Sequence, residues 1–239
     1  MTLNLILPFL SSLISLILTF FIFKRFALKK KLHLLFWGIG MAFYGLGGFC
    51  EGYFGVFGWN ELIFRFWYLF GAILVAAWLG QGSVYLLWPN KKASHLLTIL
   101  LIIGSIYSVF KVAGASLDPS LMTGSLHTGS ELSGHAITTP GVRILTPFFN
   151  LYGTMTLVGG AIWSTYIFYK KRILLHRTIG SILIALGAIA PAFGGTASRY
   201  GIPNALYLGE FLGVVLIFLG FLRATNPIED IKEKLIDIP

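Results

Sequence analysis

The chain has 239 residues, of which 56% are hydrophobic and only 11% are charged, and its formal net charge is +9. Soluble domains carry about 25% charged residues, so this chain cannot present a charged surface on all sides, and its solvent must largely be lipid. The composition excludes a water-soluble globular domain, and the lack of any basic domain with groove-reading or base-stacking elements excludes nucleic acid as a partner.

Seven apolar stretches are long enough to cross a bilayer core, which takes about 20 helical residues. They cover residues 3–23, 33–54, 62–88, 96–115, 144–169, 178–198 and 204–222. The first has no basic residue before it and no cleavage signature of small residues after it, so we interpret it as a retained span. The sequence therefore predicts an all-α, polytopic membrane bundle of seven transmembrane helices, forming one domain over residues 1–225.

Basic residues predict the direction in which the chain threads the membrane. Of the 18 lysine and arginine residues, 14 follow the first, third, fifth or seventh stretch. They are Lys24, Arg25, Lys29, Lys30, Lys31, Lys91, Lys92, Lys170, Lys171, Arg172, Arg177, Arg223, Lys232 and Lys234. Cytoplasmic loops are rich in such residues, so we expect an N-out, C-in protein of a bacterial or archaeal inner-membrane type. Anionic membrane lipids are its natural partners.

The longest connection, residues 116–143, falls on the predicted outer side. Its glycines and its Asp118–Pro119 pair favour turns, and it has no sustained apolar period. We therefore expect a loop or lid there. Residues 226–239 are predicted to form a short cytoplasmic tail, either as an amphipathic helix on the membrane surface or as a frayed end.

Glycines predict where the helices touch, because small residues let membrane helices approach closely. The second stretch carries one set on a single face, and the seventh carries another: Gly38, Gly45, Gly48 and Gly52, and Gly209, Gly213 and Gly220. These stripes predict helix–helix contacts, and self-association through one of them stays open. Gln81 and Ser83 are expected to form interhelical hydrogen bonds.

Ionisable side chains within a membrane are costly and need a physical reason. Glu210 is the deepest of them, because it precedes Arg223 at the inner boundary by 13 residues, or about 20 Å of a core about 30 Å thick. The other polar residues of the outer half that are candidates for a ligand-binding site are Glu51, Arg65, Asn150 and Arg199. We expect salt bridges between Glu51 and Arg65 and between Glu210 and Arg199.

A local pair between Glu61 and Arg65 is also expected, because they are four residues apart on a helix. All these charges are either ion pairs that lock the bundle or part of a ligand site. The leading hypothesis is a non-enzymatic membrane protein that binds a small solute, an ion, a lipid or a partner subunit through its outer half. Transport is a lesser variant of it, because Pro191 and the glycines near it form the only predicted helix break.

Two alternatives remain open. One is an intramembrane enzyme acting on a lipid or isoprenoid, with Glu210 as acid or base and with Arg65 or Arg199 holding an anionic headgroup. The other is a scaffolding subunit of a membrane complex or homo-oligomer. The sequence assigns no catalytic residue, because motifs such as H-E-x-x-H, the P-loop and G-x-S-x-G are absent.

No cofactor and no metal site is predicted. None of the five histidines falls in the middle of a predicted span, so a haem held between two histidines has no ligands there. The seventh stretch contains no lysine that could bind retinal.

Overall fold

The computed structural model describes residues 2–88, 90–118, 120, 134–171, 175–202 and 204–225. Its long elements are all helices: α1 (Thr2–Lys29), α2 (Leu32–Phe57), α3 (Glu61–Phe66), the π-helix η1 (Trp67–Leu74), α4 (Val75–Leu87), α5 (Lys91–Ala113), α6 (Val142–Lys171), α7 (Leu175–Arg199) and α8 (Ala205–Ala224). The predicted tail, residues 226–239, lies outside the described residues.

Within the described residues, six helical segments are long and apolar enough to cross a membrane. They are Leu5–Lys29, Leu32–Phe57, Glu61–Leu87, Lys91–Ala113, His176–Ser198 and Ala205–Ala224. The predicted stretch 144–169 also forms one continuous helix, α6, but it is not among these six. The all-helical class is thus confirmed for the described residues, and the six long apolar helices are compatible with a multi-pass membrane protein.

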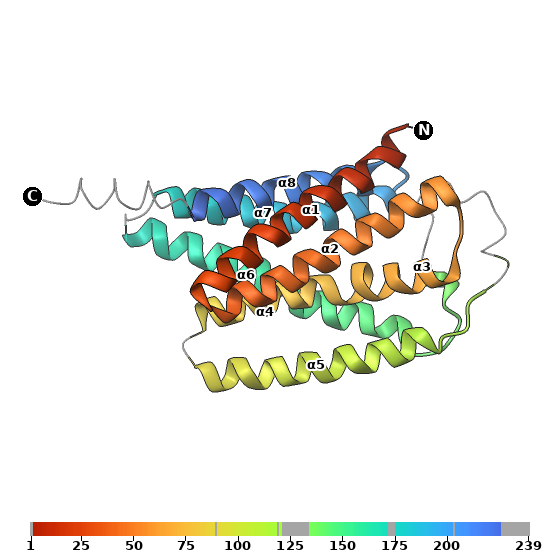
Figure 1. Cartoon of the computed structure of the whole chain (residues 1–239), viewed down its shortest axis with the longest axis horizontal. Helices are drawn as coiled ribbons and strands as arrows, with labels where there is room; N and C mark the ends of the chain where they lie inside the picture. The colour runs from red at the N-terminus through yellow and green to blue at the C-terminus, as the bar shows by residue number, and fades with distance from the viewer. Residues whose placement is uncertain are drawn as a thin grey trace, which may run out of the picture.

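The helices lie side by side with their axes roughly along one direction (Figure 1). Around the bundle, α1 packs on α2, α2 on α4, α4 on α6, α6 on α7, α7 on α8, and α8 returns to α1. These six form a closed ring, and α5 lies outside it against α4 and α6 (Figure 1). The ring turns faces of α2 and α8, far apart in the sequence, toward a common interior.

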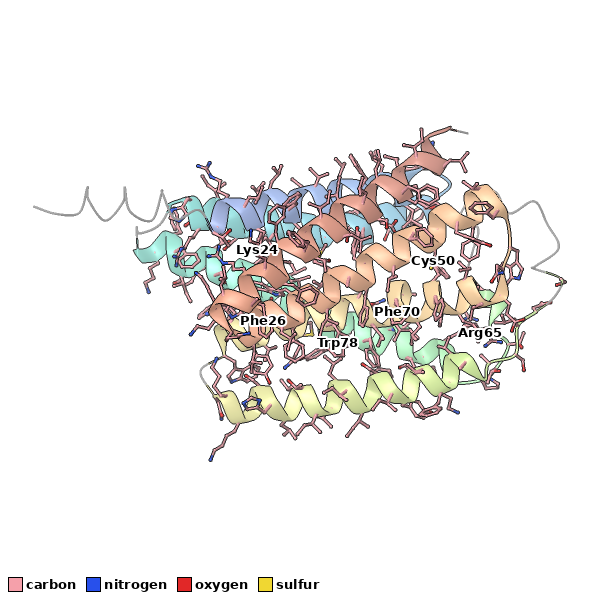
Figure 2. The ribbon with its side chains drawn as sticks, viewed as in Figure 1. Lys24, Phe26, Cys50, Arg65, Phe70 and Trp78 are labelled. Carbon is pink, nitrogen blue, oxygen red and sulfur yellow. The ribbon has the colours of Figure 1, made fainter. Side chains whose placement is uncertain are left out.

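Basic residues gather at one end of the bundle. Lys29 ends α1, Lys91 begins α5, and Arg223 lies in the last turn of α8. Figure 2 shows Lys24 toward this end and Arg65 at the opposite end, near the connection between α5 and α6. Positive charge is therefore concentrated at one end of the bundle.

The described parts of the connection between α5 and α6 contain only short local structure. Leu117 and Ile137 form an isolated β-bridge, and Gly134–Ala136 form one 3-10 turn. The Ser120 hydroxyl and backbone N–H both donate to the Asp118 carboxylate, and they hold the pKa of that carboxyl below its usual range. Residues 121–133 of the predicted loop lie outside the described residues.

The predicted glycine faces are contact faces. A Cβ added to Gly48 would lie 3.1 Å from the Pro8 carbonyl oxygen in α1. One added to Gly213 would lie 2.8 Å from the Gly187 carbonyl oxygen in α7. The prediction is thus confirmed in both helices, because neighbouring backbones occupy the space that a side chain would need.

The third span changes helix type partway, from α3 to η1 to α4. At η1 the backbones of two helices meet, since a Cβ on Gly47 of α2 would lie 3.0 Å from the Gly71 Cα. π-Helical segments are frequent at functional sites. The irregular span is thus the third, whereas the sequence had pointed to Pro191, which lies inside the continuous helix α7.

Candidate functional site

Two carboxyl groups meet inside the ring. The carboxyl groups of Glu51 of α2 and Glu210 of α8 are close neighbours. Glu51 is only 5% exposed, and Glu210 is partly buried. Glu51 precedes the end of α2 at Phe57, and Glu210 follows the start of α8 at Ala205. Both therefore lie about 8 to 9 Å from the end of the bundle opposite the basic residues.

Aromatic side chains hold this pair in place. The Trp67 Nε1–H of η1 donates to Glu51 Oε1 over 2.8 Å. The Tyr44 hydroxyl of α2 donates to the backbone carbonyl of Glu210 over 2.7 Å. Tyr44 and Glu51 lie seven residues apart on one face of α2. One helix face thus contacts both η1 and α8.

The second oxygen of Glu51 has an unusual environment. Glu51 Oε2 is buried and has no hydrogen-bond partner among the residues that the structure describes. The Glu210 carboxyl is its neighbour, and an ionised carboxylate can only accept hydrogen bonds. A hydrogen bond between the two carboxyl groups would therefore require a proton on one of them.

Arg65 has other partners than the one expected. Its guanidinium forms a salt bridge of 2.5 Å with Glu61, which confirms the predicted local pair. It also donates to the carbonyl oxygens of Val112 and Ala115, the latter over 2.8 Å. The expected salt bridge with Glu51 was wrong: Glu51 faces the interior of the ring, while Arg65 ties α3 to the carbonyl end of α5, where a cation is favoured.

The remaining two candidates do not join the pair in the described contacts. The Asn150 amide donates to the Ala72 carbonyl over 3.2 Å, so it satisfies a backbone group of η1. Arg199 ends α7, but its side chain lies outside the described residues. The predicted salt bridge between Glu210 and Arg199 therefore stays a prediction.

A second polar network links α4, α5 and α6 nearer to the basic end. The Tyr152 hydroxyl donates to the Gln81 side-chain oxygen, and the Gln81 amide donates to Thr98 Oγ1 over 2.8 Å. Thr98 Oγ1 donates to the Tyr85 hydroxyl over 2.9 Å, which in turn lies 2.8 Å from His95 Nδ1. The interhelical bonds predicted for Gln81 are confirmed.

Sequence reasoning missed the direct contact between the two acids and the roles of Tyr44 and Trp67. Glu51 and Glu210 were each assigned an arginine, because opposite charges are the usual partners in a membrane. The one available signal was their similar depth near the same end of the bundle. Nothing in the local sequence distinguishes Trp67 from an aromatic residue that faces lipid.

Comparison with protein-family models, with curated proteins and with solved structures finds no match for this chain. Its function is therefore inferred from the geometry of the carboxyl pair and its neighbours.

Proposed function

We propose that this chain is a non-enzymatic, seven-span protein of a cell membrane, and that its Glu51–Glu210 pair binds a proton in the outer half of the bundle. The observation that carries the proposal is the buried Oε2 of Glu51, which has no hydrogen-bond partner among the described residues and has the Glu210 carboxyl as its neighbour. The sequence predicted a ligand among small solutes, ions, lipids and partner subunits, and we propose that this ligand is a proton.

The topology of the proposal is N-out and C-in, with α6 as the seventh span. α6 packs between α4 and α7 as a full member of the ring, which supports counting it as a span. Lysine and arginine are enriched on the cytoplasmic side of membrane proteins. The basic end of the bundle is therefore the cytoplasmic end, and the carboxyl pair lies in the outer half of the bundle. The membrane we propose is the inner membrane of a bacterial or archaeal cell.

Electrostatics favours a proton as the bound ion. Two carboxylates within hydrogen-bonding distance repel each other, and sharing one proton replaces this repulsion with a hydrogen bond. The Trp67 N–H stabilises negative charge that remains on Glu51, because hydrogen bonds to ionised acceptors are stronger than neutral ones. The pair can thus take up and release a proton while keeping its neighbours in place.

The surroundings of the pair favour an ion over a lipid substrate. An enzyme acting on a lipid needs a cation beside the acid to hold the headgroup, and Arg65 is engaged by Glu61 and the end of α5. The open surface hollows of about 380 Å³ and about 340 Å³ are lined by other residues than Glu51 and Glu210. A proton needs no cavity of that size.

Infrared difference spectroscopy on the protein in lipid nanodiscs tests the proposal. An alkaline pH jump should remove a protonated-carboxyl band from the wild-type protein. Glu51→Gln and Glu210→Gln should each lack that band, because the remaining carboxylate then accepts from a glutamine amide. Glu61→Gln, which changes an exposed acid at the same end, should keep it. A band that persists in both pair variants would place the proton elsewhere and refute the proposal.

A further inference from the structure

An open groove of about 340 Å³ runs between α4 and α6. Its wall includes Trp88, which follows α4, and Met155 and Trp163 of α6. These three side chains are 48%, 69% and 55% exposed, so the groove opens on the side of the bundle that would face lipid. Gly159 forms part of its floor, and a Cβ added there would meet no atom within 4 Å. The groove is therefore a space that the protein leaves unfilled.

The groove has a defined direction. α4 and α6 both run toward the basic end of the bundle, so Trp88 and Trp163 mark its end on that side. Ser83 and Met155 lie about 8 to 12 Å deeper, as the helical rise dictates. Tryptophan is enriched at the membrane–water interface. The tryptophan end of the groove thus corresponds to the headgroup level, and its deeper part to the acyl region.

Basic side chains lie toward the tryptophan end of the groove, at the start of α5 and the end of α6. Lys91 donates to the carbonyl oxygens of Tyr85 and Trp88 over 2.8 Å and 3.0 Å, which fixes its charge at the end of α4. Lys92 beside it is exposed. Lys170 is exposed as well, lies about two turns beyond Trp163 on the same face of α6, and holds its Nζ 5.8 Å from the Tyr166 ring centre.

One polar side chain in the groove is open to a partner. Ser83 is 5% exposed, lines the groove, and makes no side-chain hydrogen bond to another described residue. Its predicted interhelical hydrogen bond is therefore not found among them. A hydroxyl at this depth can donate to an ester carbonyl oxygen, which phospholipids carry just below the headgroup.

We propose that this groove binds one anionic phospholipid, with an acyl chain between α4 and α6 and its headgroup held by Lys92 and Lys170. From the deep end of the groove toward the basic end, the apolar walls, the Ser83 hydroxyl, the two tryptophans and the positive charge follow the order of acyl chain, ester and headgroup. The anionic leaflet of the inner side supplies such lipids. This inference uses the orientation proposed above, but it does not depend on the carboxyl pair.

Native mass spectrometry tests the groove. The full-length protein is reconstituted in vesicles of phosphatidylglycerol and phosphatidylcholine, extracted in mild detergent, and its retained lipid is counted. Wild-type protein should retain one phosphatidylglycerol. Gly159→Leu should lose it, because the leucine fills the groove without displacing another group. Ala192→Leu, which also places a leucine at an exposed position, in α7, should retain it.

The lysines test the choice of headgroup. Lys92→Gln and Lys170→Gln should each weaken phosphatidylglycerol retention about fivefold, since each basic side chain near an anionic surface contributes on that scale. Lys111→Gln is the matched control, because Lys111 also lies over a tyrosine ring, that of Tyr107, but at the other end of α5. Retention that is unchanged in Gly159→Leu overturns the groove as a site. Retention that is unchanged in both lysine variants overturns its preference for anionic lipid.

Discussion

At the scale of single residues, the buried acids and their partners are the least predictable part of the molecule. The positions of Glu51 and Glu210 along their predicted spans placed both residues in the same half of the bundle, as the structure does. Trp67 donates to the side chain of Glu51, and Tyr44 donates to the backbone of Glu210. Charge alone could not predict that two like groups lie together, because two ionised carboxylates repel each other.

Removing the tryptophan donor should weaken the site. Trp67→Phe keeps the aromatic ring but leaves Glu51 Oε1 without its N–H donor. Hydrogen bonds between membrane helices contribute about 0.6 to 1.7 kcal/mol. A double-mutant cycle of Trp67→Phe with Glu51→Gln, followed by unfolding in mixed micelles, should therefore give a coupling energy in that range. Trp163→Phe, an exposed tryptophan, should show no coupling with Glu51→Gln.

High pH should destabilise the wild-type protein through the same pair. If the folded protein holds a proton between Glu51 and Glu210, the folded state binds more protons than the unfolded one above about pH 4.3, where free glutamate ionises, and its stability falls with rising pH until the folded pair also loses that proton. In Glu210→Gln the side chain at position 210 cannot ionise, so this variant should lack the loss of stability. Glu61→Gln should keep it. The measurement is the unfolding temperature in nanodiscs from about pH 4 into the alkaline range. Parallel curves for wild type and Glu210→Gln would contradict the proposed proton.

At the scale of elements, hydropathy predicted the helices well because each apolar stretch must pair its backbone groups internally in lipid. The glycine stripes of α2 and α8 also predicted contact faces correctly. The π-helical segment of the third span was missed. It depends on the close approach of Gly47 to Gly71 and on the Asn150 amide at the Ala72 carbonyl, which are tertiary contacts without a local sequence signal.

The contact between α7 and α8 should be sensitive to added bulk. A leucine at Gly213 meets the Gly187 carbonyl oxygen, which would lie 2.8 Å from its Cβ, so the two helices must separate. Overpacking of this kind costs about 1 to 3 kcal/mol. Thermal unfolding should therefore show a lower midpoint for Gly213→Leu. Gly159→Leu, whose Cβ meets no atom within 4 Å, should unfold like the wild-type protein.

At the scale of the whole molecule, two features organise the bundle: the closed ring of six helices with α5 outside it, and the gathering of basic residues at one end (Figures 1 and 2). The first brings α2, η1 and α8 together around the carboxyl pair. The second gives the bundle one positively charged end, which the positive-inside rule and anionic lipids place on the cytoplasmic side of the membrane.

Cysteine labelling tests the orientation. Cys50 is 3% exposed and should react poorly, so introduced cysteines can be read against a low background. On intact cells, a membrane-impermeant maleimide should label Tyr200→Cys, which replaces a residue that is 86% exposed at the predicted outer end. It should label Lys30→Cys only after lysis. Labelling of Lys30→Cys from outside would reverse the topology and move the carboxyl pair to the inner half.

The sequence by itself determined the helical class, the positions of the apolar stretches, the segregation of basic charge and the glycine contact faces. These follow from local composition, because transfer into lipid and close helix approach depend on the residues of one segment at a time. Only the tertiary structure decided that Glu51 meets Glu210 instead of Arg65, that the third span contains a π-helix, and that α4 and α6 leave a groove. Each of these depends on which faces of distant helices meet, and no single segment encodes that.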